Sequence, residues 1–423
     1  MKSKGLMKSA SIYTGSNILT SAIPFLLLPI LTRVLSPADY GIVAMFGIMV
    51  SIFAAFTGLN TQGAISIRFF EQERIYLPQY VANCLLILLL STSVVLLCTY
   101  LFKGVLASLS SVPEEWLMIA VLVAAMQFVV LVRLSLWQVS KQAWKYGAMQ
   151  VGQSGLNSGL SLWFILVVGL AWEGRTLAIV IASPIVLIIA FTSLWRDGLI
   201  RSSINLKYIK DALRFGVPLI PHTLGALLIA AIDRIMVTNL LDVSQTGVFT
   251  VALQIGMVLS LLTGAFNQAY APWLFEHLKS RDDAQKIQIV RYTYLYFVVV
   301  GCIALTLGQL APAILSVLVG KDFRAGASIV ITVAAGFAFG GMYYMVTNYI
   351  FFAGATARLA FITLTAGVIN VVITYLLISK HGLAGAGYGF MISQAVLFLG
   401  TWFLAHRVYP MPWKKALIGW RSV

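Results

Sequence analysis

The sequence has few charged residues and few of the residues that catalysis or metal binding uses. Only 10% of its 423 residues are Asp, Glu, Lys or Arg, whereas a soluble domain has about 25%. It has four histidines and three cysteines, and it has no HExxH, P-loop or GxSxG pattern. We therefore expect no metal site and no catalytic residue, and we predict that the protein is not an enzyme. Cys84, Cys98 and Cys302 lie in apolar runs, which favours three small hydrophobic residues over a disulfide.

What the sequence has in abundance is apolar residues: they make up 60% of the chain, and the mean hydropathy is +0.92. Many apolar runs reach the roughly 20 residues that a helix needs to cross a bilayer, and none alternates like the strands of an outer-membrane barrel. We expect an all-α polytopic membrane protein with about twelve transmembrane helices. The expected spans are residues 10–32, 40–61, 80–102, 116–135, 148–170, 176–195, 216–240, 246–269, 292–318, 327–352, 359–379 and 384–405.

Lys and Arg are unevenly shared between the two sides of this topology. The N-terminal segment and every second loop hold 21 of the 29 basic residues, and the other loops hold six. The positive-inside rule therefore places the N- and C-termini in the cytoplasm. The same asymmetry accounts for most of the +15 net charge, so no nucleic acid partner is needed to explain it.

Reporter fusions test this topology. Fusions at residues 205 and 280 and at the C-terminus are expected to give cytoplasmic signals, because each lies in a segment rich in basic residues. The readout is the activity of a reporter that works on only one side of the membrane. An external signal at residue 205 would contradict a chain of two six-span halves.

Two pairs of segments suggest an internal repeat. LTRVLSPADYGIVA (31–44) aligns with VTNLLDVSQTGVFT (237–250) at an offset of 206 residues. A second set matches at an offset of 213, pairing Asn157, Gly169 and Gly174 with Asn370, Gly382 and Gly387. The alternative is chance similarity between apolar segments. The repeat predicts two six-helix bundles, residues 1–205 and 206–423, around a central cavity.

The connector between the halves, residues 196–218, interleaves apolar and basic residues. One interpretation is a helix that lies on the anionic inner leaflet. The other is a solvated loop whose basic residues reflect only the positive-inside rule.

Polar side chains inside apolar spans are costly in hydrocarbon and tend to face a cavity or a neighbouring helix. Asn17, Asn267, Asn348 and Tyr344 lie on polar faces of such spans, and prolines that bend the helix follow Asn17 and Asn267. We expect them to line the cavity; helix packing is the alternative. Arg133 lies near the inner end of its span, where it either serves as a cation or extends to the interface.

Asp233 and Arg234 stand side by side within LLIAAIDRIMVTNLL (227–241). Adjacent helical residues point about 100° apart, and each ion costs roughly 2.5 to 3.5 kcal/mol at the bilayer centre, so we expect each to have its own surroundings. Two interpretations are open. Either the two form a structural ion pair, or Arg234 contacts a phosphate and Asp233 orients it or binds a coupling cation.

Three longer stretches carry a family resemblance: LTRVLSPADYGIVAMF, RFGVPLIPHTLGALLIAAIDRIMVTNLL and GVFTVALQIGMVLSLLTGAFNQAYAPWLF. They resemble the polysaccharide-transporter branch of the multidrug/oligosaccharidyl-lipid/polysaccharide exporters, and the layout is similar to Wzx-type O-antigen flippases. The resemblance implies alternating access and transfer of an undecaprenyl-pyrophosphate-linked oligosaccharide from the cytoplasmic to the periplasmic leaflet of a bacterial inner membrane. It implies membrane lipids and other glycan-assembly membrane proteins as partners.

Such a substrate is anionic and hydrated, so its passage needs cations and polar groups. Arg234, Asp233, Arg133, Asn17, Asn267, Asn348 and Tyr344 are the expected substrate-binding residues. No cofactor is expected, and the coupling ion, H⁺ or Na⁺, is left open. A drug or cation exporter of the same superfamily is one alternative function. A membrane-embedded glycan polymerase or ligase is another, against which the short outward loops argue.

Overall fold

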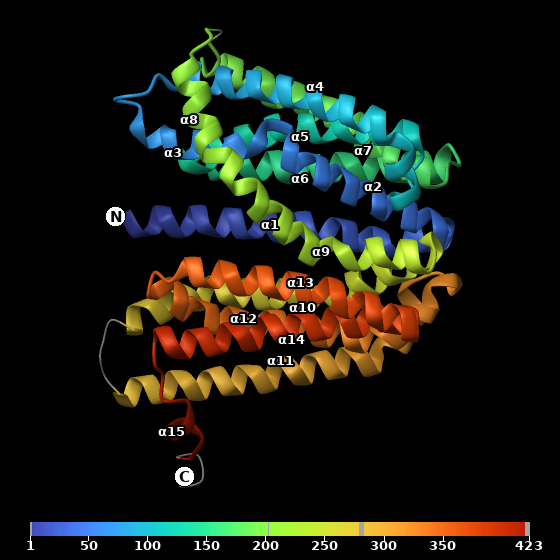
Figure 1. The fold of residues 1–423 in the computed structure, drawn as a ribbon, viewed down its shortest axis with the longest axis vertical. Helices are drawn as coiled ribbons and strands as arrows, with labels where there is room; N and C mark the ends of the chain where they lie inside the picture. Colours follow the sequence, from blue (N-terminus) through green and yellow to red (C-terminus); the bar gives the residue numbers. More distant parts are fainter. Residues whose placement is uncertain (1, 202, 279–282, 419–423) are drawn as a thin grey trace. The chain divides into compact units, whose positions relative to one another are not determined.

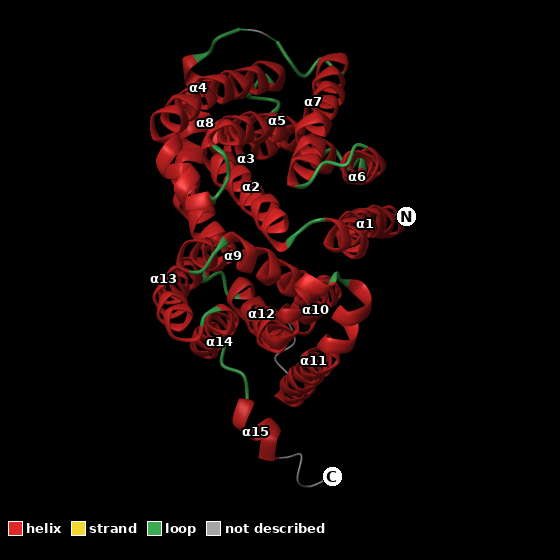
Figure 2. Cartoon of the chain, turned by 90° about the vertical axis from the view of Figure 1, so that its right-hand side faces the viewer, coloured by secondary structure: helices red, strands yellow, loops and turns green. Residues whose placement is uncertain are grey.

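The computed structural model describes residues 2–201, 203–278 and 283–418, and every regular element in these ranges is a helix (Figure 2). Each expected span falls on one of the twelve long helices found there. These are α1 (Lys2–Val34), α2 (Pro37–Phe56), α4 (Leu77–Ser110), α5 (Glu114–Val139), α6 (Ala143–Leu162), α7 (Trp172–Arg196), α9 (Ile220–Leu240), α10 (Val243–Leu278), α11 (Asp283–Leu318), α12 (Ala327–Phe352), α13 (Thr356–His381) and α14 (Leu383–Val408). Three shorter helices are α3 (Thr61–Arg68), α8 (Leu206–Gly216) and α15 (Trp413–Ile418).

Ten of the described helices are long and apolar enough to cross a membrane, and an eleventh span forms if α8 and α9 are taken as one bent helix. The remaining long helix, α6, is more polar because its sequence AWKYGAMQVGQSGLNSGLSL includes glutamine, asparagine and serine. The chain is therefore an all-α multi-pass membrane protein.

The chain forms two compact units, Met1–Ala231 and Ile232–Val423. In the first unit α5 packs on α2, α4 and α7, and α1 lies beside α6 (Figure 1). In the second unit α12 contacts α10, α11 and α14, and α13 packs on α14. The expected division after residue 205 separates six spans from six and stays a prediction. The compact units divide later, within α9, because α8 packs on α3 and α4 of the first unit.

The connector helix α8 is docked on protein. Its residue Ala212 is completely buried in the core of the first unit, while Lys207, Lys210 and Arg214 are exposed. Arg68 of α3 donates from Nε and Nη2 to the Asp211 carboxylate, at 2.9 and 2.8 Å. Of the two interpretations of this segment, the structure supports a helix, but its apolar face packs on the first unit.

Helix ends in the two halves agree with the sequence repeat. α1 ends at Val34 and α2 begins at Pro37, and the corresponding ends of α9 and α10 lie 206 residues later. The residues between them are similar as well: the Ser36 side chain caps α2, and the Asp242 carboxylate accepts from the Gln245 backbone N–H at 2.7 Å. The starts of α6 and α13 differ by the second offset, 213 residues.

The second expected span, 40–61, is broken before its end. α2 stops at Phe56, and Gly58, Leu59 and Asn60 all have positive φ. A Cβ at Gly58 would lie 2.2 Å from the Phe128 ring, so only glycine fits this turn. The polypeptide then continues as α3 toward the Arg68 contact with α8.

Candidate functional site

Asp233 is the centre of a buried polar cluster in the second unit. Its side chain is only 3% exposed, and its Oδ1 lies 3.0 Å from the Thr374 hydroxyl. The same hydroxyl lies 2.9 Å from Oδ1 of Asn370, to which Ser393 donates at 2.6 Å. We call Asp233, Asn370, Thr374 and Ser393 the Asp233 node. It joins α9, α13 and α14 through side chains that are all buried.

Close approach of α13 and α14 makes this node. Asn370 and Thr374 are four residues apart on α13, so they share one face of the helix. Gly389 of α14 lies against them: a Cβ there would come within 2.4 Å of the Thr374 hydroxyl. Gly389, the last glycine of GLAGAGYG (382–389), thus allows tight helix packing.

Arg234 has different surroundings from its neighbour. Its side chain is partly exposed, while that of Asp233 is buried. The two charges interact electrostatically. The expectation that each residue of the pair has its own environment is confirmed.

The first unit has a cluster at the repeat-equivalent position. Asn157 and Ser161 of α6 correspond to Asn370 and Thr374 at the offset of 213 residues. The guanidinium of Arg175, in the first turns of α7, donates from Nη1 to both side chains. We call Arg175, Asn157 and Ser161 the Arg175 node. In each unit, an asparagine and a hydroxyl residue lie one helical turn apart. In the first unit they bind the Arg175 guanidinium, and in the second they bind the Asp233 carboxyl group through the Thr374 hydroxyl.

Arg175 was not among the residues expected from the sequence, because it was placed in an outward loop. In the part of the chain that the structure describes, no carboxylate lies within ion-pair distance of it. Its hydrogen-bond partners are neutral. The sequence signal that points to it is the pairing of Asn157 with Asn370 in the repeat.

Asn267 and Asn348 are brought together in the second unit. Nδ2 of Asn348 donates to Oδ1 of Asn267 at 2.9 Å, which links α12 to α10. Tyr344 lies one turn before Asn348, partly buried, with its ring 6.0 Å from that of Tyr343. Asn17 lies in the first unit, where its side chain is exposed on α1. The polar faces expected from the sequence are thus a helix-to-helix contact in one unit and an open surface in the other.

Arg133 is buried in the first unit, where it pairs with a residue just after the end of α7. It is 1% exposed, its Nη2 pairs with the Asp197 carboxylate, and its guanidinium lies 4.3 Å over the Trp137 ring. It also lines a cavity of about 380 Å³ together with Gln142 and Lys145. Because Arg133 already has a carboxylate partner, its charge is largely neutralised within the protein.

The Arg133–Asp197 pair gives an asymmetric stability prediction. Asp197→Asn leaves a buried guanidinium without a counter-charge and is expected to cost about 3 kcal/mol. Arg133→Met is expected to cost less than half as much, because the Asp197 side chain is 42% exposed and water can solvate it. Thermal unfolding of the detergent-purified variants measures both, with Lys145→Gln in the same cavity as the control. Equal losses for the two variants would contradict a buried pair of unequal partners.

Among the described residues, no three His, Cys, Asp or Glu side chains are grouped so that they could hold a metal ion. Cys84 is buried, and Cys98 and Cys302 are exposed; all three are free thiols. The two nodes offer hydrogen bonds and charge, and Asp233 also offers a carboxyl group that can exchange a proton.

Comparison with known proteins adds a family and a fold. The model of a polysaccharide biosynthesis protein family matches residues 6–278. An uncharacterized membrane protein of Haemophilus influenzae is 26% identical over 366 residues, covering 84% of this chain and 86% of the relative. The Lsg locus putative protein 1 of the same organism is 24% identical over 359 residues, covering 82% and 85%.

Solved structures share the fold as well, among them the two that follow. The inward closed conformation of the lipid II flippase MurJ aligns with a TM-score of 0.75 at 14% identity, covering 97% of this chain and 89% of that one. An inward-facing multidrug resistance MATE family transporter of the MOP superfamily aligns with a TM-score of 0.68 at 18% identity, covering 94% of each chain. At these identities the likeness concerns the fold.

Proposed function

The chain belongs to the polysaccharide biosynthesis protein family, and from this we propose that it carries an undecaprenyl-pyrophosphate-linked oligosaccharide, such as an O-antigen repeat unit, across a bacterial inner membrane. The resemblance predicted from the sequence is confirmed at the level of the family, and the fold shared with the MurJ flippase and the MATE transporter supports a transport function for this multi-pass membrane protein. The proposed transfer runs from the cytoplasmic to the periplasmic leaflet by alternating access. Other glycan-assembly membrane proteins would supply and consume the substrate.

The observation that supports an anionic substrate is the Arg175 node. A guanidinium in a transmembrane segment is costly, yet Arg175 is held only by neutral groups. Because no carboxylate in the described part of the chain neutralises the guanidinium, it keeps its full positive charge. Two oxygens of a pyrophosphate could accept hydrogen bonds from its N–H groups. We propose Arg175 and Arg234 as phosphate contacts, and Asn17 and Tyr344 as contacts to the glycan. Arg133 is a weaker candidate because Asp197 already neutralises it.

The Asp233 node supports coupling to a proton. In the orientation that the structure gives, Oδ1 of Asn370 accepts from both Thr374 and Ser393. The Thr374 hydroxyl has one hydrogen, so when it donates to Asn370, its 3.0 Å contact with Asp233 requires a proton on the carboxyl group. When Asp233 is ionised, that hydrogen turns to the carboxylate instead. The cluster thus has two hydrogen-bond arrangements that differ by one proton, and we propose H⁺ as the coupling ion.

The same buried carboxyl group favours a second candidate, a drug or cation exporter of this superfamily. An organic cation would be drawn to Asp233 and repelled by Arg175 and Arg234, whereas a lipid pyrophosphate would be drawn to the arginines. The two functions therefore predict opposite responses to the same substitutions.

Ligand binding to the purified protein separates the two candidates. Undecaprenyl pyrophosphate bearing an oligosaccharide is expected to bind, and to bind more weakly to Arg175→Gln. Ethidium is expected not to bind, or to bind without dependence on Asp233. Ethidium binding that is lost in Asp233→Asn, without binding of the lipid, would favour the cation exporter.

A further inference from the structure

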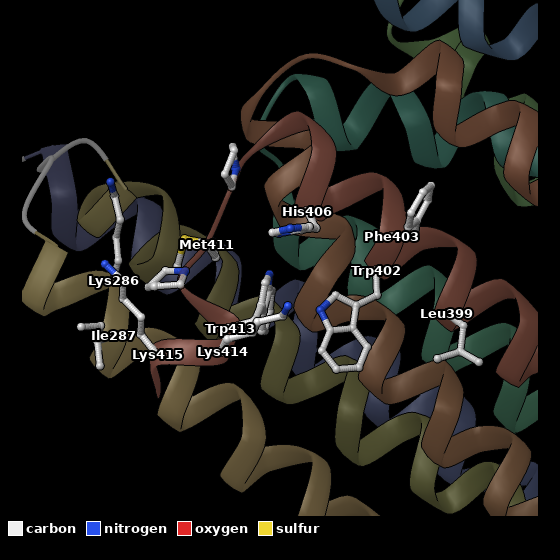
Figure 3. A pocket seen from close by; sticks show the side chains of 12 residues that line it. Lys286, Ile287, Leu399, Trp402, Phe403, His406, Met411, Trp413, Lys414 and Lys415 are labelled. Atoms are coloured by element: carbon white, nitrogen blue, oxygen red, sulfur yellow. The ribbon is translucent and has the colours of Figure 1, made fainter. Parts of the chain in front are cut away.

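The second unit has a pocket that the transport proposal does not use. It has a volume of about 700 Å³ and lies between the first turns of α11, the last turns of α14 and the segment leading into α15 (Figure 3). Its walls are largely apolar, and they include Trp402 and Phe403 of α14 and Trp413 of α15. Under the predicted topology these chain segments meet at the cytoplasmic face of the membrane.

Aromatic contacts form the wall of the pocket in the absence of a ligand. The Trp402 and Trp413 rings meet edge to face with centroids 5.2 Å apart. Tyr294 of α11 donates its hydroxyl hydrogen to the Trp413 carbonyl at 3.3 Å, and the Tyr294 ring lies 5.9 Å from the Trp413 ring. Met411 and Ala416 on either side of Trp413 are buried. The segment is thus packed onto α11, so it can form one wall of a preformed pocket.

The rim of the pocket is basic. Lys286, Lys414, Lys415 and His406 line it, and among the residues described by the structure no acidic side chain does. The Arg407 guanidinium lies 4.5 Å over the ring of Phe403, which adds a further cation beside the pocket. Residues 402–418 contain no Asp or Glu. An anion is therefore the ligand that the charges favour.

The two ends of the pocket differ in polarity. Figure 3 shows Lys286 and Lys415 at one end and Leu399 at the other. Leu399 and Phe403 are 55% and 60% exposed and lie one turn apart on α14, so they form a continuous apolar strip. The strip rises from the basic rim toward the membrane interior by about 10 Å. This length and polarity match the first part of an acyl chain below a charged headgroup.

One buried donor in the pocket wall is without a protein partner. Trp413 is 8% exposed, and in the described part of the chain its indole Nε1 makes no hydrogen bond. Buried tryptophan N–H groups normally find an acceptor, because an unsatisfied donor is costly. Because the nitrogen itself is buried, a headgroup oxygen would satisfy it only after the indole ring turns toward the pocket.

We propose that this pocket binds an anionic phospholipid of the cytoplasmic leaflet, with its phosphate at the lysines and one acyl chain along Leu399 and Phe403. A free phosphate ion would not use the apolar strip, and a zwitterionic lipid would not use the excess of cations. None of its lining residues belongs to either node, so the proposed lipid site is distinct from the proposed transport residues.

Native mass spectrometry of the full-length protein with added lipid tests the site. Dioleoylphosphatidylglycerol is expected to bind more tightly than dioleoylphosphatidylcholine. In Lys414→Gln/Lys415→Gln the first phosphatidylglycerol should bind about 30-fold more weakly, because each basic residue at an anionic lipid surface contributes about a factor of five. Lys207→Gln/Lys210→Gln, which removes two exposed lysines from α8, is the matched control and should bind like the unmodified protein.

Two further measurements separate headgroup from chain. Phe403→Ala should reduce binding of the dioleoyl lipid more than that of a short-chain phosphatidylglycerol, and glycerol phosphate should not compete. Competition by glycerol phosphate would assign the pocket to a soluble phosphate and overturn the proposal. Equal binding of the two headgroups, or unchanged binding in the double lysine variant, would overturn it as well.

Discussion

Asp233→Asn is expected to abolish glycan export while the protein stays inserted and folded. Asparagine has nearly the shape of aspartate, and it can still donate to or accept from the Thr374 hydroxyl, so the Asp233 node keeps its hydrogen bonds. It cannot take up or release a proton, so the two arrangements of the node can no longer alternate. Glycan display at the cell surface, measured together with the membrane level of the protein, gives the result. Asp322→Asn, at an exposed position of the same unit, is the control and should export normally.

Double substitution tells whether Asp233 and Arg234 serve transport or only each other. If they form a structural ion pair, Asp233→Ala/Arg234→Ala should be milder than either single change, because a lone intramembrane charge costs more than none. If both residues serve transport, as we propose, the double variant is as inactive as the worse single variant, and Arg234→Lys keeps partial export because the charge survives. Restored display in the double variant would reduce the pair to structure. Normal display in Asp233→Asn would exclude this carboxyl group as the coupling site.

Arg175→Gln is expected to abolish export without lowering the stability of the protein. Arg175 lies in the first turns of α7, at the end of the span, and its hydrogen-bond partners are neutral, so its removal leaves no buried carboxylate without a counter-charge. Glutamine can still hydrogen-bond to Asn157 and Ser161. Arg175→Lys should retain part of the export, since it keeps the charge and loses the planar fork.

Stability and export together distinguish a transport residue from a packing residue. Asp197→Asn is the useful contrast, because it leaves the buried Arg133 without a counter-charge. This variant should unfold at a lower temperature than Arg175→Gln. The measurements are thermal unfolding of the purified variants and surface display in cells. If Arg175→Gln unfolds at a clearly lower temperature than the unmodified protein, or exports normally, Arg175 is not a substrate contact.

The helices could be predicted from the sequence because the length of an apolar run is a local property. All twelve expected spans lie on long helices, and α6 was included although it is polar. The break after Phe56 was missed, because the turn depends on the approach of Phe128 from α5 and not on the residues of the turn alone. The end of α9 and the start of α10 agree with the repeat, since Asp242 caps a helix where Ser36 does.

The candidate site could be predicted only in part, because its partners come from distant segments. Asp233 stood out as a charge in an apolar run, but its partner Thr374 is 141 residues away and is an ordinary residue by itself. Asn267 and Asn348 were each expected on a polar face, and nothing local shows that they bond to one another. Arg175 was counted with an outward loop, because it precedes the expected span 176–195. The sequence alone does not reveal that its side chain reaches Asn157 and Ser161 of α6.

Lipid transfer by the purified protein in vesicles is the most direct test of the central claim. The measurement follows a fluorescent undecaprenyl-pyrophosphate oligosaccharide from one leaflet to the other, in protein-containing and protein-free vesicles with and without a pH gradient. We predict protein-dependent transfer that the gradient accelerates and that Asp233→Asn and Arg175→Gln abolish. Transfer no faster than in protein-free vesicles, with efflux of ethidium from the same vesicles, would contradict proton-coupled transfer of a lipid-linked oligosaccharide.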